Sequence, residues 1–141
     1  MISRSEIVET ARACLGTPFH HQGRMPGVGL DCVGLVVVVA KKLEAAYTDM
    51  RAYSMRPDGK TLLEMLRFNS CLQELSSPDA AQSGDVLVFQ FIGPVWPQHV
   101  GIRTDKGMIH TYTALKRVVE EPYSDVWRGR ATHAFQFMGA F

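Results

Sequence analysis

The sequence predicts an α+β fold in which helices come first and an antiparallel sheet follows. Patterns of helical period occupy the N-terminal part, while the chain after Gly84 contains short runs of β-branched and aromatic residues separated by Pro, Gly and Asp. Helices and strands in separate blocks, without alternation, are typical of this class. With 141 residues and no internal repeat or Gly/Ser-rich linker, the chain is expected to form a single domain over residues 1–141.

Composition and charge exclude several classes of function. Hydrophobic residues make up 46% and charged residues 21%, which is typical of a soluble globular domain. Fifteen basic and fourteen acidic side chains give a net charge of +1, too balanced for the electrostatic binding of nucleic acid. The longest apolar run, residues 33–40, is far shorter than the roughly 20 residues that cross a bilayer. We therefore expect no nucleic-acid partner and no membrane insertion.

The N-terminus and the cysteines indicate a reduced protein without a secretory signal. The first ten residues carry two acids and lack the basic start and unbroken apolar stretch of a signal peptide. Three cysteines, Cys14, Cys32 and Cys71, leave at least one thiol unpaired and build no disulfide framework. Neither Cys-x-x-Cys nor His-Glu-x-x-His occurs, so the commonest zinc signatures are absent and no cofactor is implied.

Two capping boxes predict helices. A Ser-x-x-Glu pattern at Ser3 starts a helix over residues 2–15, which a Gly-x-Pro sequence ends. The inner face of this helix is expected to carry Ile7, Ala11, Cys14 and Leu15. A second capping box at Thr61 predicts a shorter helix over residues 61–68.

The segment after Asp31 is ambiguous between helix and strand. Asp31 is a good N-cap, and the apolar run continues into helix-forming residues 40–47, so a buried helix is consistent with the pattern. Four consecutive valines favour a strand by intrinsic propensity. Periodicity alone leaves both interpretations open.

Five short strands are expected after Gly84, each bounded by turn-forming residues. They are residues 85–91, 99–103, 108–112, 117–120 and 134–137. Their close succession predicts a meandering antiparallel sheet.

Cys32 is the first candidate for chemistry. It directly follows Asp31, and if the segment is helical it lies in the first turn, where unpaired backbone N–H groups and the helix dipole stabilise a thiolate and lower the pKa of the thiol. Cysteine is equally a common buried packing residue, and position alone does not separate the two interpretations.

His99 and His110 are the second candidate. A two-residue hairpin loop at residues 105–106 places His99 opposite Tyr112 and His110 diagonally on the same face, where the imidazoles can touch. A one-residue change in register would place them on opposite faces, as two ordinary histidines of a sheet. A nucleophilic thiol needs a base and a group that orients the base, and Cys32 with the two histidines supplies these parts.

Four sequence blocks resemble the NlpC-type cell-wall cysteine peptidases in order and spacing. The blocks are Leu-Asp-Cys-Val-Gly-Leu-Val at residues 30–36, Gly-Asp-Val-Leu-Val-Phe at 84–89, Gln-His-Val-Gly-Ile at 98–102 and Met-Ile-His at 108–110. Residues 15–24 and 27–32 are further similar to the subset of this family encoded among the tail genes of bacteriophages and gene transfer agents. The resemblance covers nearly the whole chain.

The resemblance implies a papain-like fold in which Cys32 begins a helix packed on the antiparallel sheet, so the segment after Asp31 is interpreted as a helix. It implies hydrolysis of an amide in the peptide stem of peptidoglycan, commonly the bond between D-γ-glutamate and diaminopimelate. By motif position, Cys32 is the nucleophile, His99 the general base and His110 the residue that orients His99. The backbone N–H of Cys32 is the expected donor to the oxyanion.

Substrate binding is assigned to further residues, which are Phe19, His21, Asp31 and Trp96. Phe19 stands where many family members have Tyr, and it cannot donate a hydrogen bond. His21 either lines the cleft or lies in a solvated loop. Trp96 either forms a wall of the substrate groove or anchors its own loop.

The implied setting is the tail of a phage-like particle, assembled in the host cytoplasm and acting at the cell wall. The expected partners are the peptidoglycan stem peptide and hub proteins of the tail tip or baseplate. Two alternatives stay open: a structural adaptor at the tail tip with weak or lost catalysis, which Phe19 favours, and a thiol acyltransferase or amidase acting on a different amide. A metal ion on Cys32, His99 and His110 fits the ligand types, but no closed tetrahedral set is present in the sequence.

Overall fold

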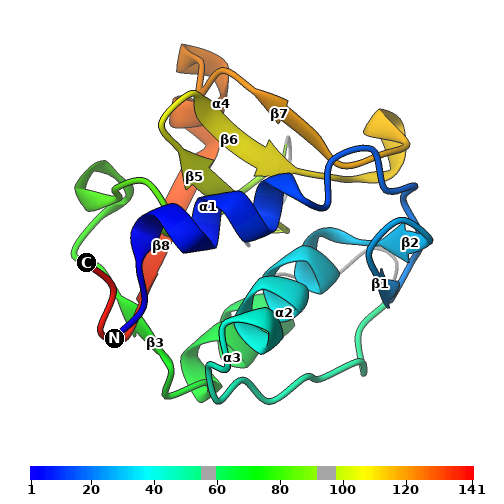
Figure 1. Ribbon diagram of the computed structural model, residues 1–141. Coiled ribbons are helices and arrows are strands. Elements are labelled where there is room, and N and C mark those ends of the chain that lie inside the picture. Colours follow the sequence, from blue (N-terminus) through cyan, green and yellow to red (C-terminus); the bar gives the residue numbers. More distant parts are fainter. Residues whose placement is uncertain (55–59, 92–97) are drawn as a thin grey trace.

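Six antiparallel strands form the central sheet, in the order β3-β8-β4-β5-β6-β7 (Figure 1). The computed structural model describes residues 1–54, 60–91 and 98–141. The strands of the sheet are β3 (Leu72–Glu74), β4 (Val86–Phe89), β5 (His99–Thr104), β6 (Gly107–His110), β7 (Val119–Glu121) and β8 (Ala131–Phe137). The strands β4 to β7 form the predicted meander, and β8 returns to pair between β3 and β4. The α+β class is confirmed.

Helices cover both faces of the sheet. The helices are α1 (Arg4–Arg12), α2 (Cys32–Lys42), α3 (Lys60–Phe68) and α4 (Asp125–Arg130). Val86 and Val88 of β4 join the core formed with α1, α2 and α3, while Leu87 and Phe89 join a second core around Trp127 of α4. Neighbouring side chains of a strand point to opposite faces, so β4 is apolar at every position.

The first helix starts at the predicted cap and ends earlier than predicted. The Ser3 side chain accepts a hydrogen bond from the Glu6 backbone N–H, as a capping box requires. The helix ends at Arg12, and Leu15, which was expected on the inner face, is 41% exposed. The expectation for Leu15 is wrong because the chain has already left the helix and turns at Gly16, which has a φ of 83°.

The second helix contains the four consecutive valines, so the helical interpretation is confirmed. The Asp31 carboxylate caps it by accepting a hydrogen bond from the Gly34 N–H at 2.7 Å. Most of its side chains lie in the core, where burial outweighs the weak preference of valine for strands. A Cβ at position 34 would collide with the carbonyl of Gly23, so Gly34 lets the preceding hairpin pack closely beside Cys32.

Several small elements are not predicted by the sequence. Inside the expected loop at residues 17–30, β1 (Arg24–Met25) pairs with β2 (Gly29–Leu30). Further additions are β3, α4 and the 3-10 turns η1 (Pro78–Ala80) and η2 (Thr113–Leu115). Only the first side chain of β3 is buried, and α4 is six residues long and contains a glycine, so neither has a clear periodic signal. The ends of α3 and of the predicted strands shift by a few residues.

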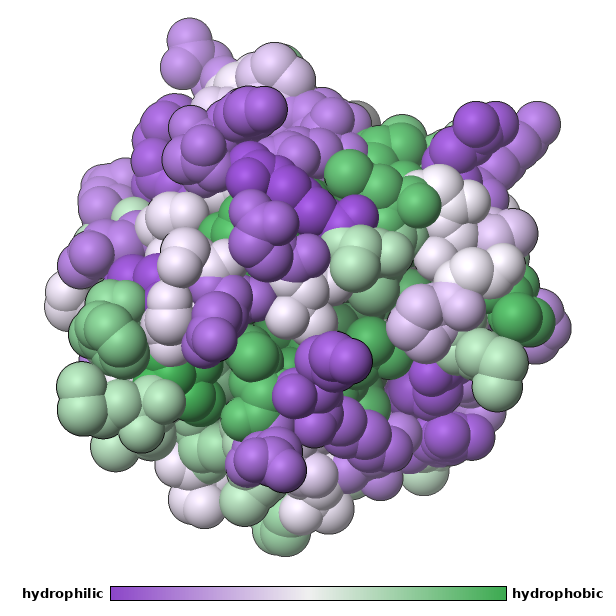
Figure 2. All heavy atoms as spheres, viewed as in Figure 1, coloured by the Kyte–Doolittle hydropathy of each residue, from purple (hydrophilic) through white to green (hydrophobic). Residues whose placement is uncertain are grey.

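Charged and apolar side chains are interspersed over the face shown in Figure 2. Large exposed apolar side chains occur at several separate places in the chain, among them Met25, Phe68 and Phe141. Isolated exposures of this kind are ordinary for a globular surface. In the described part of the chain, no helix combines the length and the apolar character needed to span a membrane.

Candidate active site

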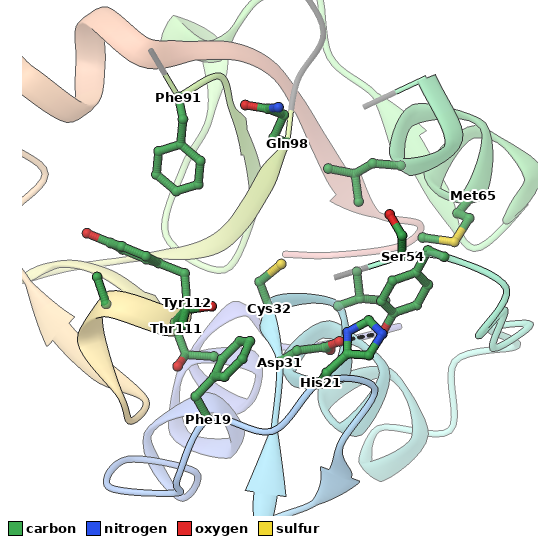
Figure 3. Close-up of a pocket in the computed structure, with 15 residues that line it drawn as sticks. Phe19, His21, Asp31, Cys32, Ser54, Met65, Phe91, Gln98, Thr111 and Tyr112 are labelled. Carbon is green, nitrogen blue, oxygen red and sulfur yellow. Dashed lines mark hydrogen bonds between the residues drawn. The ribbon is translucent and has the colours of Figure 1, made fainter. Parts of the chain in front are cut away.

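A pocket of about 360 Å³ opens beside the N-terminus of α2, with the sulfur of Cys32 among the side chains that surround it (Figure 3). Most of the lining is apolar and comes from Phe19, Val33, Leu62, Met65, Phe91 and Tyr112. Polar groups are contributed by His21, Asp31, Tyr53, Gln98 and Thr111. An apolar pocket of this size with a few polar groups is typical of a site for a small molecule or a short peptide segment.

The Cys32 thiol is neutral at neutral pH. Burial raises the pKa of Cys32 to about 12, and the adjacent Asp31 carboxylate acts in the same direction. Backbone N–H groups of Val100, Val33 and Cys32 itself lower the pKa without outweighing burial. The expectation that the helix N-terminus lowers this pKa below its ordinary value is therefore wrong for the free protein. The hydrogen bond from the Val100 N–H also shows that the sulfur lies against β5. Val100 directly follows His99 in this strand.

His99 and His110 form a hydrogen-bonded pair. Thr104 pairs with Gly107 across the loop, and this register places Gly101 opposite His110. His99 Nε2 lies 2.9 Å from His110 Nδ1, and both rings are buried. The hairpin register predicted from the two-residue loop is confirmed. Because Nε2 of His99 is used in this contact, Nδ1 is the nitrogen left for a second partner.

Burial lowers the pKa of both imidazoles. For His99 the neighbouring His110 adds to the effect of burial, and the pKa lies well below the ordinary value. For His110 burial is again the largest cause, and Glu121 opposes it. Both rings are therefore neutral at neutral pH, which is the form in which imidazole accepts a proton.

Glu121 of β7 lies next to His110, on the side of the ring away from His99. Its Oε2 lies 3.2 Å from His110 Nε2, in an alignment too poor for a hydrogen bond, and its Oε1 accepts a hydrogen bond from Trp127 Nε1 at 2.8 Å. The Trp127 ring packs edge-on against His110, with ring centroids 4.9 Å apart. Glu121 cannot be predicted from the sequence as part of the site, because only the pairing of β6 with β7 brings it to His110.

Asp31 is engaged on both carboxylate oxygens. Oδ1 accepts hydrogen bonds from the Gly34 N–H and from Arg24. Oδ2 accepts from the Gln22 N–H at 2.8 Å and from the Tyr53 hydroxyl at 2.6 Å. Arg24 also donates to the Tyr53 hydroxyl, at 2.8 Å. Asp31 thus connects the N-terminus of α2 to Tyr53, which lines the pocket. Arg24 and Tyr53 are not predicted from the sequence, because no local motif connects them to Asp31.

Four of the residues assigned to the site from the sequence line the pocket, whereas the buried His99–His110 pair is not part of its lining. Phe19, His21 and Asp31 line the pocket with Cys32. Trp96 lies outside the described residues. Within the part of the chain that the structure describes, no three His, Cys, Asp or Glu side chains are grouped so as to hold a metal ion.

Comparison with known proteins identifies the family. The model of the NlpC/P60 family matches residues 16–136. A search of curated protein sequences gave no match. Among solved structures, the NlpC/p60 domain of the peptidoglycan hydrolase SagA is similar over 96% of this chain and 100% of that chain, with 23% identity and a TM-score of 0.65.

Two further solved structures have the same fold. An NlpC/P60 family protein from Bacillus cereus is similar over 96% of this chain, with 21% identity and a TM-score of 0.67. NlpC1 from Trichomonas vaginalis is similar over 93% of this chain, with 16% identity and a TM-score of 0.65. The similarity spans 40% and 42% of the lengths of those two proteins. Because the family model matches most of the sequence, from before Cys32 to beyond His110, the chain belongs to the NlpC/P60 family of cysteine peptidases.

Proposed function

We propose that this protein is a peptidoglycan endopeptidase in which Cys32 is the nucleophile, His99 the general base and His110 the residue that orients His99. The observation that carries the proposal is the hydrogen-bonded pair of His99 on β5 and His110 on β6, together with the contact between the Cys32 sulfur and the Val100 N–H of β5. A thiol, a base and an orienting group are the parts that nucleophilic acyl transfer needs. Membership of a family that contains peptidoglycan hydrolases supports a stem-peptide amide as the substrate, and we assign the bond between D-γ-glutamate and diaminopimelate.

The reaction starts from a neutral thiol and a neutral imidazole. His99 Nδ1 takes the proton of Cys32 as the sulfur attacks the amide carbonyl, since burial keeps both groups uncharged in the free protein. The resulting imidazolium gives this proton to the departing amine, which leaves a thioester on Cys32. His99 then takes a proton from water as the water oxygen attacks the thioester. The acid product departs, and the proton returns to the sulfur.

Glu121 determines which nitrogen of each imidazole carries the proton. A carboxylate beside His110 Nε2 favours a proton on that nitrogen, which leaves His110 Nδ1 as an acceptor. His99 then carries its proton on Nε2, and this N–H donates a hydrogen bond to His110 Nδ1. The Nδ1 of His99 stays unprotonated and can accept the proton of Cys32. Glu121 is therefore a positioning residue, which acts on the thiol through both histidines.

The pocket supplies the remaining parts. The backbone N–H of Cys32, at the start of α2, is the proposed donor to the oxyanion. Phe19 and His21 contact the stem peptide from the lining, and Trp96 is proposed as a further contact. Asp31 acts on the substrate through Tyr53, because its own oxygens already have donors.

The setting that we propose is the tail of a phage-like particle, in which residues 1–141 form one catalytic domain. Support comes from residues 15–24 and 27–32, which are similar to the tail-gene subset of the family. The partners would be hub proteins of the tail tip or baseplate. The protein would be assembled in the host cytoplasm and would act at the cell wall.

Digestion of purified peptidoglycan tests the function. The wild-type protein should release stem peptides whose masses show a new amine on diaminopimelate, and Cys32→Ala should release none. Cys71→Ala is the matched control, because Cys71 is a free cysteine that does not line the pocket. Release of no product by the wild-type protein would contradict the proposal and favour the tail-tip adaptor. Cleavage at another amide would overturn the assigned bond only.

A further inference from the structure

Thr111 carries a buried hydroxyl with no hydrogen-bond partner among the described residues. Its side chain lies in the lining of the pocket, and the residue is 0% exposed. Continuing the register of β5 and β6 by one pair places Thr111 opposite Val100, whose N–H acts on the Cys32 sulfur. The unpartnered hydroxyl and the thiol therefore belong to residues that line the same pocket (Figure 3).

An unpaired hydroxyl in this position destabilises the folded protein. Burying a hydroxyl without a partner costs free energy, and folded proteins contain few such groups. Valine has the same shape as threonine and would avoid the cost. The other buried threonine of this hairpin, Thr104, shows the usual arrangement, because its Oγ1 donates to Glu120 Oε2 at 2.6 Å. A hydroxyl kept unpaired next to a reactive thiol is explained by a partner that arrives with the substrate.

We propose that Thr111 Oγ1 donates a hydrogen bond to a carbonyl oxygen of the peptide substrate. This inference rests on the proposed function and adds a substrate-binding residue to it. Two other polar groups of the pocket are already occupied: Asp31 accepts four hydrogen bonds, and the Tyr53 hydroxyl donates to Asp31 and accepts from Arg24. The Thr111 hydroxyl is free to donate, and a peptide carbonyl is the acceptor that every stem peptide brings.

Thr111→Val tests this role, because the variant should lower kcat/KM without lowering the Tm. We expect kcat/KM for a synthetic stem tripeptide of L-Ala, γ-D-Glu and diaminopimelate to fall about tenfold, mainly through KM. The Tm should stay level or rise, because the variant removes an unpaired buried hydroxyl. Thr111→Ser, which restores the hydroxyl, should recover most of the lost kcat/KM.

Thr104→Val is the matched control with the opposite signature. It removes a hydroxyl that has a partner, so the Tm should fall while kcat/KM stays near the wild-type value. An unchanged kcat/KM for Thr111→Val would overturn the proposal. A lower Tm for Thr111→Val would overturn it too, since that result means the hydroxyl already has a structural partner.

Calorimetric binding of the same tripeptide to the inactive Cys32→Ala protein separates this proposal from the proposed function. If the peptide binds but the wild-type protein does not cleave it, the function fails, and a tenfold weaker affinity after adding Thr111→Val still supports the role of Thr111. If the peptide is cleaved and Thr111→Val binds it as tightly as its parent, the function stands and the Thr111 proposal fails. If the peptide is neither bound nor cleaved, the proposed function and the role of Thr111 are both contradicted.

Discussion

His99 Nε2 lies 2.9 Å from His110 Nδ1, and the far nitrogen of His110 faces Glu121 at 3.2 Å. The two contacts connect three consecutive strands of the meander, β5, β6 and β7. In the mechanism proposed above, this line of groups decides which nitrogen of His99 is free to take a proton. In this mechanism the carboxylate of Glu121 thus acts on the Cys32 sulfur through the two histidines, without contacting it.

Glu121→Gln should lower kcat and leave KM near the wild-type value. The amide keeps the shape of the side chain and an oxygen for Trp127 but removes the charge that favours a proton on His110 Nε2. We expect kcat to fall about tenfold. The acid limb of the pH profile should move to lower pH, because Glu121 raises the pKa of His110 and its charge is lost. Steady-state kinetics between pH 5 and 9 measures both effects.

Glu120→Gln is the control for this variant. The side chain of Glu120 bonds to Arg12 and Thr104 and has no contact with the histidine pair among the described residues. Its kcat and pH profile should match those of the wild-type protein. An unaltered kcat and pH profile in Glu121→Gln would remove Glu121 from the mechanism.

The free energy of unfolding should fall as the pH falls below about 6.5. Burial lowers the pKa of His99 and His110, so the folded state stays unprotonated while the unfolded chain takes up protons. Each group contributes a slope of up to about 1.4 kcal/mol per pH unit between its unfolded and folded pKa. Urea unfolding at pH 7.5, 6 and 5 gives the slope. The dependence should be weaker in His99→Gln, and an equal slope in both proteins would show that His99 is not buried as a neutral ring.

Asp31→Ala should destabilise the protein by about 3 kcal/mol. The change removes the cap of α2, leaves the Tyr53 hydroxyl and the Gln22 N–H without their acceptor, and removes one of the acidic partners of Arg24. Urea unfolding compares it with Arg67→Ala, which breaks the exposed ion pair to Glu74 and should cost no more than about 1 kcal/mol. Equal losses in the two variants would mean that the Asp31 network adds nothing beyond a surface contact.

Local chemistry made part of this site predictable. The Asp31 cap and the β5–β6 register follow from short-range rules, and the register alone places His99 beside His110. The expectation for Leu15 is wrong because the point at which a helix ends depends on a turn and on tertiary packing.

The rest of the site depends on contacts between distant segments. Arg24 and Tyr53 reach Asp31 from separate loops, and Glu121 reaches His110 only after β7 pairs with β6. For the same reason, the sequence predicts a lowered pKa for Cys32, whereas the structure gives a raised one. The helix N-terminus is a local feature that sequence reveals, whereas the burial that outweighs it is a property of the whole fold.

The central claim is that Cys32 and His99 act in one step, and a double-variant cycle tests it most directly. Residues that act as a unit give strongly non-additive losses when they are removed together. We expect kcat/KM for the stem tripeptide to fall at least about a thousandfold in Cys32→Ala and in His99→Ala, with no further loss in the double variant. His133→Ala, which replaces a half-buried histidine outside the pocket, should retain activity. Losses that multiply in the double variant, or near wild-type activity in either single variant, would contradict the account.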